Sequence, residues 1–179
     1  SNNRAYPSTA TEFEVRKMFG GSPVFPKEAK ILKQTDDFMW IETCNTDYIK
    51  KYIILYKYPV VKGEDMMSRK SLIKHNLEAI NTNIPGTREG SYMTHSKFLD
   101  PTVEYMRYNN KSFAEIRGLW DVENDYMGGP FMAHVLYSPD GKYMLGIEGF
   151  VYAAKFDKLQ YIRDVEAVVY SFQWQSKDK

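Results

Sequence analysis

The hydrophobic residues of the chain follow a helical spacing in three stretches. Residues 8–19 predict a short helix that Ser8 or a nearby threonine can cap. Residues 64–86 predict a second helix, and residues 155–172 predict a third with Asp157 as its N-cap candidate. The apolar faces consist of Met67, Leu72, Ile73, Leu77 and Ile80 in the second helix, and of Phe156, Leu159, Ile162, Val165, Val169 and Phe172 in the third.

The rest of the chain has the composition and turn spacing of β-strands. Residues 29–44 contain two strand segments joined by a polar turn. Residues 47–61 are rich in Tyr and Ile and predict a strand that ends at Pro59. Five more strands follow, separated by turns that include Met127–Pro130 and the hairpin sequences YNNKS and SPDGK. Their predicted ranges are residues 91–99, 102–108, 112–120, 131–138 and 143–154.

This order of elements predicts an α+β fold. Closely spaced strands with short turns form an antiparallel meander, and a helix with a single apolar face must cover another layer. We therefore expect one antiparallel sheet with two to three helices packed mainly on one face. The whole chain, residues 1–179, is expected to form a single domain, because a chain of that length buries roughly 70% of its unfolded surface.

Charge and composition argue against several classes of protein. The chain has 24 Lys and Arg against 23 Asp and Glu, whereas a nucleic-acid-binding protein normally carries a basic excess. Apolar runs such as residues 52–56 are far shorter than the roughly 20 residues of a membrane span. The single cysteine, Cys44, leaves no internal disulfide and no cysteine-based zinc site. Fourteen tyrosines indicate either an aromatic sheet core or exposed platforms for a sugar or peptide.

One acidic segment begins like a calcium-binding loop. Asp121, Glu123 and Asp125 fall at alternate positions, as the first ligands of an EF-hand do. The sixth position, which should be Gly, is Tyr126, and the twelfth, which should be Glu, is Met132. The flanking segments also have strand composition, so the sequence does not predict an EF-hand.

Other short motifs do not complete a catalytic or metal site. His75, His95 and His134 lie on different predicted elements, and no pair has the spacing of metal ligands on a helix. Cys44 has acidic neighbours, which would raise the pKa of its thiol. Residues 84–93 contain Gly, Arg and Ser but lack the Gly-Lys-Ser/Thr of a phosphate loop. We therefore predict no cofactor and no metal.

The strand around residues 113–120 is the best candidate for a binding site. Alternation places Glu115 and Arg117 on one face between apolar residues, so either that face is solvated or the two charges have partners on adjacent strands. On the other face, Gly118 beside Trp120 leaves room for a ring or a close backbone. The predicted ligand-binding residues are Glu115, Arg117, Trp120, Tyr126, Gly128 and Gly129.

Three long segments resemble a family of proteins. IPGTREGSYMT, EIRGLWDVENDYMGGPF and EGFVYAAKFDK are similar to the C-terminal half of an uncharacterised, domain-of-unknown-function family of Bacteroidetes cell-envelope lipoproteins, and the likeness extends from about residue 8 to 172. The resemblance implies a periplasmic or outer-membrane location, a fragment of a longer lipoprotein, and membrane contact only through a lipid anchor outside this fragment. It lends no catalytic residues.

Three hypotheses for the function remain. The favoured one is a non-catalytic envelope domain that binds a protein, peptide or glycan partner, and not nucleic acid. A second is a hydrolase-like enzyme that uses carboxylates among Glu115, Asp121, Glu123, Asp125 and Glu148, which requires two carboxyl groups about 5–10 Å apart in one cleft. A third is a structural half-domain that packs against a missing N-terminal half.

Overall fold

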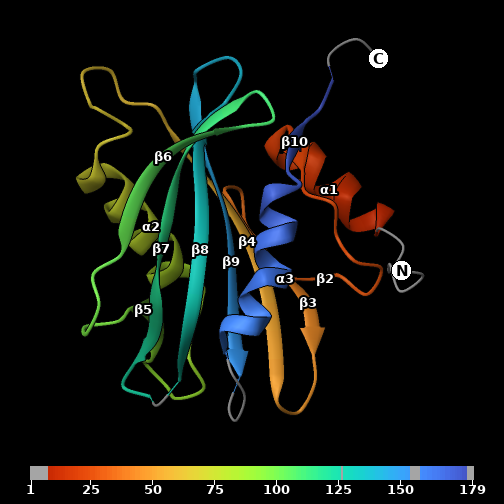
Figure 1. Cartoon of the computed structure of the whole chain (residues 1–179), viewed down its shortest axis with the longest axis vertical. Coiled ribbons are helices and arrows are strands. Elements are labelled where there is room, and N and C mark those ends of the chain that lie inside the picture. The colour runs from red at the N-terminus through yellow and green to blue at the C-terminus, as the bar shows by residue number, and fades with distance from the viewer. Residues whose placement is uncertain (1–7, 126, 154–157, 177–179) are drawn as a thin grey trace.

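Eight antiparallel strands form one strongly curled sheet, a half-barrel, and three helices pack against it (Figure 1). This is a computed structural model, and it describes residues 8–125, 127–153 and 158–176. The predicted α+β class with a single large antiparallel sheet is confirmed. A separate two-stranded sheet, which the sequence did not predict, joins segments from the two ends of the described chain.

The large sheet has the strand order β2–β3–β4–β9–β8–β7, and two strands share the outer side of β7. β6 pairs with the first half of β7, and β5 pairs with its second half. The strand bounds are β2 Lys30–Gln34, β3 Phe38–Asn45, β4 Ile49–Pro59, β5 Tyr92–His95, β6 Thr102–Tyr108, β7 Lys111–Glu123, β8 Gly128–Tyr137 and β9 Tyr143–Ala153.

The pairing of β4 with β9 joins two meanders into one sheet. The first meander is β2–β3–β4 and the second is β6–β7–β8–β9. The β4–β9 ladder runs without a register shift from Ile49 opposite Ala153 to Pro59 opposite Tyr143. In the second meander, Asn109 and Asn110 form the tight turn between β6 and β7 with positive φ values of 50° and 61°. Asn tolerates this conformation better than most residues, so the hairpin predicted there is confirmed.

Two of the three helices pack on one face of the sheet, and the third packs on the other (Figure 1). Helices α1 (Thr9–Phe19) and α3 (Lys158–Tyr170) share the first face, and α2 (Arg69–Asn83) covers the second. α2 begins five residues later than the predicted range, because the Ser68 side chain caps it by accepting a hydrogen bond from Ser71 N at 3.1 Å. Asp157 and Phe156, predicted for the third helix, lie outside the described residues.

Each face of the sheet has its own hydrophobic core. We call the sides the α3 face and the α2 face. The α3 face buries Val15, Phe19, Met39, Ile41, Ile53, Leu55, Phe113, Met132, Leu145, Ile147, Val165, Val169 and Phe172, among others. The α2 face buries Phe38, Ile54, Tyr56, Leu72, Ile80, Met93, Ala114, Ile116, Trp120, Phe131, Ala133 and Phe150, among others. No helix among the described residues is long and apolar enough to cross a membrane.

One predicted turn is wrong in the structure. Gly128, Gly129 and Pro130 are the first residues of β8 and pair with Asp121, Trp120 and Leu119 of β7. A proline is tolerated at the start of a strand, where the loss of one N–H donor interrupts the ladder least. The chain reversal lies earlier, where Asn124 has a positive φ of 64°.

Candidate functional site

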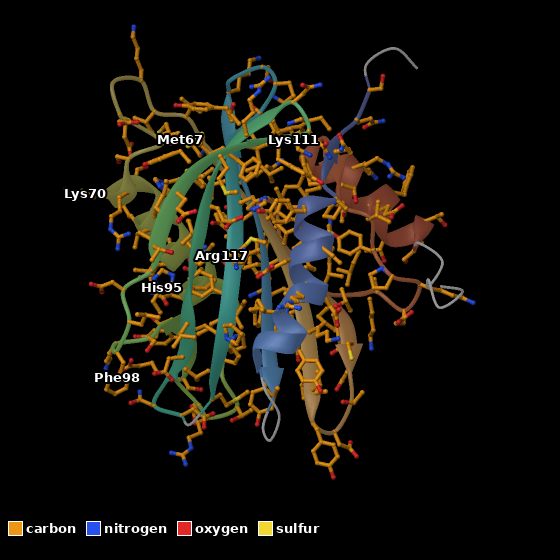
Figure 2. All side chains as sticks on the ribbon, viewed as in Figure 1. Met67, Lys70, His95, Phe98, Lys111 and Arg117 are labelled. Atoms are coloured by element: carbon orange, nitrogen blue, oxygen red, sulfur yellow. The ribbon has the colours of Figure 1, made fainter. Side chains whose placement is uncertain are left out.

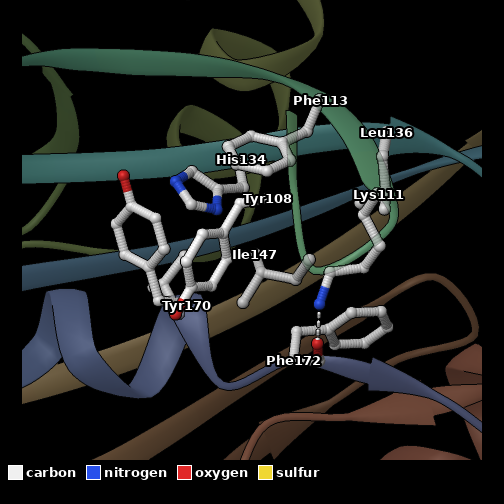
Figure 3. Close-up of a pocket in the computed structure, with 9 residues that line it drawn as sticks. Tyr108, Lys111, Phe113, His134, Leu136, Ile147, Tyr170 and Phe172 are labelled. Carbon is white, nitrogen blue, oxygen red and sulfur yellow. Dashed lines mark hydrogen bonds between the residues drawn. The ribbon is translucent and has the colours of Figure 1, made fainter. Parts of the chain in front are cut away.

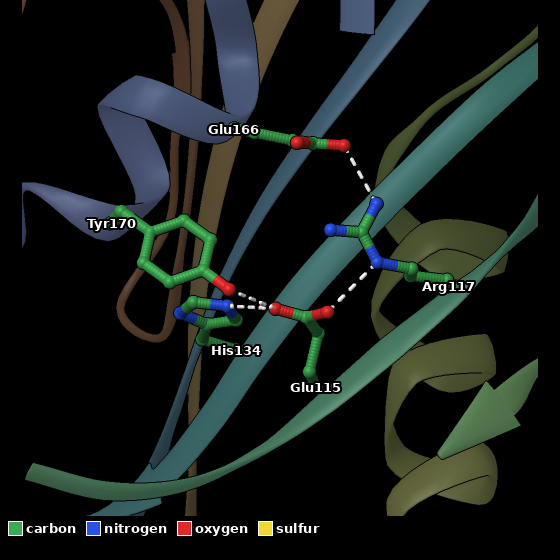
Figure 4. A network of polar contacts seen from close by, with 5 residues as sticks. All are labelled: Glu115, Arg117, His134, Glu166 and Tyr170. Carbon is green, nitrogen blue, oxygen red and sulfur yellow. Dashed lines mark hydrogen bonds and ion pairs between the residues drawn. The ribbon is translucent and has the colours of Figure 1, made fainter. Parts of the chain in front are cut away.

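Glu115 is the centre of a polar network on the α3 face (Figure 4). Its side chain is 5% exposed, and it accepts hydrogen bonds from Arg117 Nε at 2.8 Å, His134 Nε2 at 2.8 Å and Tyr170 Oη at 2.7 Å. Arg117 Nη1 also donates to Glu166 Oε1 at 2.6 Å. Of the two alternatives for this charged strand face, the structure has the one in which both charges have partners.

Hydrogen bonding keeps the Glu115 carboxylate ionised. Burial by itself would raise its pKa, but hydrogen bonds from His134, Tyr170 and Arg117, together with the Arg117 charge, lower the pKa to about 2. Burial lowers the pKa of His134, and the neighbouring carboxylate offsets only part of that effect. Burial and the hydrogen bond to Glu115 raise the pKa of Tyr170 to about 12. None of the three groups is therefore set to exchange a proton near neutral pH.

The cavity beside this network is too small for a ligand (Figure 3). Its volume is about 10 Å³, which is close to the minimum space for one water molecule. Phe113 stacks on His134 with ring centroids 4.1 Å apart, and Lys111 Nζ donates a hydrogen bond to the backbone oxygen of Phe172. The Glu115 network thus ties α3 and the segment after it to the sheet.

Trp120 and the two glycines form a close-packed contact between β7, β8 and β9. The Trp120 ring is 4% exposed, and its Nε1 donates to Val151 O at 3.1 Å. A Cβ on Gly129 would lie 2.1 Å from Val151 O, and a Cβ on Gly128 would lie 2.9 Å from Trp120 O. Gly129 therefore permits the close approach of two backbones at this point. Tyr126 lies outside the described residues.

The six predicted site residues do not gather at one place. Glu115 and Arg117 point to the α3 face, whereas the Trp120 ring lies in the core of the α2 face. This arrangement follows from the alternation of β7, which turns odd-numbered and even-numbered residues to opposite sides. A ligand-binding role for these residues remains a prediction.

A second buried network, which the sequence did not predict, lies on the α2 face. Asn76 of α2 is fully buried, and its Nδ2 donates to Glu148 Oε1 at 2.6 Å and to Tyr56 Oη at 2.9 Å. Its Oδ1 accepts from His95 Nε2 at 2.6 Å. One amide thus connects α2 with β4, β5 and β9. The sequence does contain a signal for this network. Asn76 is a polar residue four positions after Leu72 and four before Ile80, so it lies on the apolar face of the helix.

The titratable groups of the Asn76 network are held in their neutral forms. Glu148 is fully buried, and burial raises its pKa to about 8, although the hydrogen bond from Asn76 works in the opposite direction. Burial lowers the pKa of His95 to about 4. Burial also raises the pKa of Tyr56, with smaller effects from Tyr58 and Glu148. At neutral pH the Asn76 network is therefore uncharged, whereas the Glu115 network carries charge.

The α2 face also holds unpaired buried polar atoms. Within the described residues, these atoms are Trp40 Nε1, Tyr58 Oη, Asn81 Oδ1 and Glu148 Oε2. Three belong to strands whose side chains pack on the α2 face, and the fourth belongs to α2 itself. Buried polar groups are normally hydrogen-bonded, so this interface has unused capacity for hydrogen bonds.

The acidic loop that resembles the start of a calcium site has protein partners. Asp121 Oδ1 accepts from Val122 N at 2.8 Å, Thr87 Oγ1 donates to Asp125 Oδ2 at 2.5 Å, and Glu123 lies 3.5 Å from Lys97 Nζ. The three acids, Val122 and Lys97 line a polar groove of about 400 Å³. No group of three His, Cys, Asp or Glu side chains among the described residues is arranged to hold a metal ion.

Strand β6 is the open outer edge of the sheet (Figure 1), and aromatic side chains lie along it. Tyr105 is 62% exposed and Tyr108 is 47% exposed. Just before β6, the loop from β5 carries Phe98, which is 93% exposed and extends from the side of the molecule (Figure 2). The sequence does not predict a site at these residues, because their exposure depends on the tertiary fold.

Comparisons with known proteins identify a family but no activity. The family model described as "Domain of unknown function (DUF4837)" matches residues 8–171. No curated protein matches the chain. A crystal structure of a protein from Bacteroides thetaiotaomicron VPI-5482 is similar, with a TM-score of 0.49 and 7% identity. The similarity covers 89% of this chain and 47% of that one, so the chain spans about half the length of that protein.

Proposed function

Since the chain belongs to the DUF4837 family, whose function is not known, we propose from its structure that it is a non-catalytic domain that binds a protein partner. The proposed contact is an extended segment of the partner that adds to the sheet along β6. The observation that carries this proposal is a seven-residue strand, Thr102–Tyr108, that pairs on one side only and has exposed tyrosines. Strand addition to an open sheet edge is a common mode of peptide recognition.

The β6–β7 hairpin indicates which backbone groups of β6 face outward. A two-residue turn places a hydrogen bond between its flanking residues, Tyr108 and Lys111, so the backbone of Tyr108 points toward β7. Because hydrogen-bonded positions alternate along an antiparallel strand, the N–H and C=O groups of Val103, Tyr105 and Arg107 point away from the sheet. These three residues offer the donors and acceptors that an added strand needs.

Side chains on both faces of β6 can contact such a segment. Tyr105 lies on the α2 face, where its Oη donates to Met67 O at 2.5 Å (Met67 is labelled in Figure 2). Tyr108 lies on the α3 face, with its ring edge-on to Tyr170 at 5.2 Å. Aromatic residues are enriched at protein interfaces because they bury a large area at a low entropy cost.

The other strand edges are less suitable for this role. The outer side of β5 is covered by residues 84–86, since Met93 N donates to Ile84 O at 2.9 Å and Gly86 N donates to Ser91 O at 3.0 Å. Strand β2 is shorter, has a register shift against β3, and carries Lys30 and Lys33. Lysines and irregular pairing protect a sheet edge from pairing.

A display library of extended nonapeptides, selected on the purified domain, tests this proposal. Tyr105→Pro removes an outward N–H, so selected peptides should lose at least tenfold in affinity for that variant. Tyr137→Ala, at the 42% exposed tyrosine that ends β8, serves as the control and should not change the affinity. The proposal would be wrong if no peptide were enriched, or if both variants bound the peptides as wild type does.

The two other hypotheses have weaker support. Glu115 and Glu148 lie on opposite faces of the sheet, and neither is open to a cleft that could admit a substrate. Asp121, Glu123 and Asp125 line one groove, but each contacts a protein group there. A structural half-domain would be favoured by one large apolar face. The exposed large apolar side chains of the described residues instead come from separate elements, for example Phe13 on α1, Tyr48 between β3 and β4, and Phe98 before β6.

An envelope location would suit this function but rests on the family resemblance alone. Strand addition would then join this domain to another envelope protein, and a glycan partner would contact the same tyrosines. Fractionation of native cells with an antibody against the domain measures the location. Recovery in the cytosolic fraction would contradict it.

A further inference from the structure

A groove of about 440 Å³ lies between α2 and the β3–β4 hairpin. This volume is in the range of small-molecule sites in proteins. Its lining comes from the turn before β3, the end of β4 and one side of α2. The groove is on the opposite half of the sheet from β6, so it is separate from the proposed partner-binding edge.

One wall of the groove is aromatic. The Tyr58 ring stacks on the His75 imidazole with centroids 3.9 Å apart and an interplanar angle of 2°. Tyr56 continues the row, with its ring 6.2 Å from Tyr58 and nearly parallel to it. The Tyr58 hydroxyl is among the buried atoms that have no hydrogen-bond partner. The hydroxyl is buried, so this wall offers the groove a flat and mainly aromatic surface.

The charged side chains that face the groove are acidic. Asp37 and Glu78 are both exposed and line the groove. Asp37 comes from the turn between β2 and β3, and Glu78 comes from α2. Lys57 contributes to the lining, but its Nζ donates to Met18 O at 2.8 Å and lies over the Phe19 and Tyr143 rings on the α3 face. At one end, Lys33 Nζ donates to Asn83 O at 2.8 Å and offsets part of the negative charge.

The uncharged polar groups of the groove are mostly acceptors. His75 Nδ1 lies 2.9 Å from Ser71 O, which can only accept, so the Nδ1–H is committed and Nε2 is left as an acceptor when the ring is neutral. Asn83 Nδ2 donates to Ala79 O at 2.9 Å, which leaves its side-chain oxygen to accept. A ligand rich in donors and with a positive charge matches this lining.

We propose that this groove binds an organic cation, an alkylammonium or a guanidinium group, between Asp37 and Glu78 and against the Tyr58–His75 stack. A cation gains from charge-assisted hydrogen bonds to the two carboxylates and from the acceptor at His75 Nε2. Two sources have this chemistry, a free diamine and a lysine or arginine side chain of a peptide.

Titrations of the isotopically labelled domain followed by amide chemical shifts test the proposal. The probes are putrescine, 1,4-butanediol as its uncharged analogue, and Nα-acetyl-lysine methylamide for the peptide source. Putrescine or the lysine derivative should shift the amides of Tyr58, His75 and Thr82 with saturation, and butanediol should bind at least tenfold more weakly. Preference for one charged probe identifies the source of the cation.

Matched variants complete the test. Glu78→Gln should weaken binding of the charged probe roughly three- to tenfold, the range expected for loss of one charge-assisted contact near a surface. Glu104→Gln, at an exposed acid on β6, should leave it unchanged. Equal binding of butanediol, absence of saturation, or equal affinity of Glu78→Gln and wild type would overturn the proposal. The circular-dichroism spectrum of each variant verifies that it is folded.

Discussion

Glu115 and Glu148 are both buried in the eight-stranded sheet, but they lie on opposite faces and their pKa values are shifted in opposite directions. Glu115 has three hydrogen-bond donors, and its pKa is lowered to about 2. Glu148 accepts from Asn76 only, and burial raises its pKa to about 8. The number of donors around each carboxylate decides which effect is larger.

Glu148→Gln is expected to stabilise the protein at neutral and alkaline pH. Below pH 4.5 the folded and unfolded chains both hold the Glu148 proton, and between pH 4.5 and 8 only the folded chain does, so wild-type stability declines across that interval. Glutamine keeps the acceptor for Asn76 and does not ionise. In urea unfolding, the free energy of unfolding of Glu148→Gln minus that of wild type should be about 3 kcal/mol larger at pH 7 than at pH 4. The same difference at both pH values would contradict the raised pKa.

Glu115→Gln is expected to destabilise the protein and to flatten its response to acid. The folded-state pKa is below the ordinary value of 4.5, so this carboxylate contributes its full stability above pH 4.5 and loses it as the pH falls toward 2. Removing the charge also leaves buried His134 without its carboxylate partner, whereas the exposed Arg117 keeps its ion pair with Glu166. At pH 7 the free energy of unfolding of Glu115→Gln should be about 2–4 kcal/mol lower than that of wild type, and this difference should be smaller at pH 2.5. A loss that does not depend on pH would indicate a purely steric effect.

Asn76→Ala is expected to uncouple α2 from the sheet. It removes the amide that contacts Glu148, Tyr56 and His95, so it should cost about 2–4 kcal/mol. A double-mutant cycle with Glu148→Gln measures the coupling, which should exceed 0.5 kcal/mol, roughly the error of simple additivity. Leu77→Ala, on the same helix, provides the matched packing control and should show no coupling to Glu148→Gln.

Gly129→Ala is expected to cost more stability than Gly118→Ala. The new Cβ would lie 2.1 Å from Val151 O in the first case, and 2.9 Å from the Phe131 ring in the second. A backbone carbonyl within a sheet cannot move as easily as a ring. We expect a loss of more than about 3 kcal/mol for Gly129→Ala and about 1–3 kcal/mol for Gly118→Ala by thermal unfolding. The reverse order would show that the ring is the more rigid neighbour.

Proline substitutions in β6 test which backbone groups face outward. Tyr105→Pro should reduce stability by about 1–2 kcal/mol, because the lost N–H points away from β7 and only the side-chain hydrogen bond to Met67 O is lost. Met106→Pro should cost about 3 kcal/mol or more, because its N–H pairs with β7. Equal losses at the two positions would mean that the register inferred from the Asn109–Asn110 turn is wrong.

The strands and helices could be predicted because their signals are local. Asn109 and Asn110 predict a turn by themselves, and the buried residues Ile162, Val165 and Val169 follow helical spacing. The antiparallel class then follows from short connections. The β4–β9 pairing could not be predicted, since it joins segments separated by α2 and four strands, and no local pattern of residues indicates that pairing.

The candidate sites could be predicted only in part, for the same reason. The odd charges at Glu115 and Arg117 correctly indicated a polar network, but their partners His134, Tyr170 and Glu166 come from other elements. The composition of Gly128–Pro130 is typical of a turn, whereas the fit of Gly129 against Val151 depends on tertiary packing. The exposure of Tyr105 depends on which strand ends the sheet.

The small β1–β10 sheet (Gly21–Ser22 and Gln173–Trp174) has a consequence for synthesis on the ribosome. Gly21 pairs with Trp174, and Tyr143 Oη donates to Phe19 O at 2.7 Å, so α1 is fixed by residues made much later. During synthesis, α1 and the β2–β4 meander are made before their partners β9, α3 and β10. The domain therefore reaches its final structure only after β9, α3 and β10 have been synthesised, and until then the edge of β4 that later pairs with β9 is exposed.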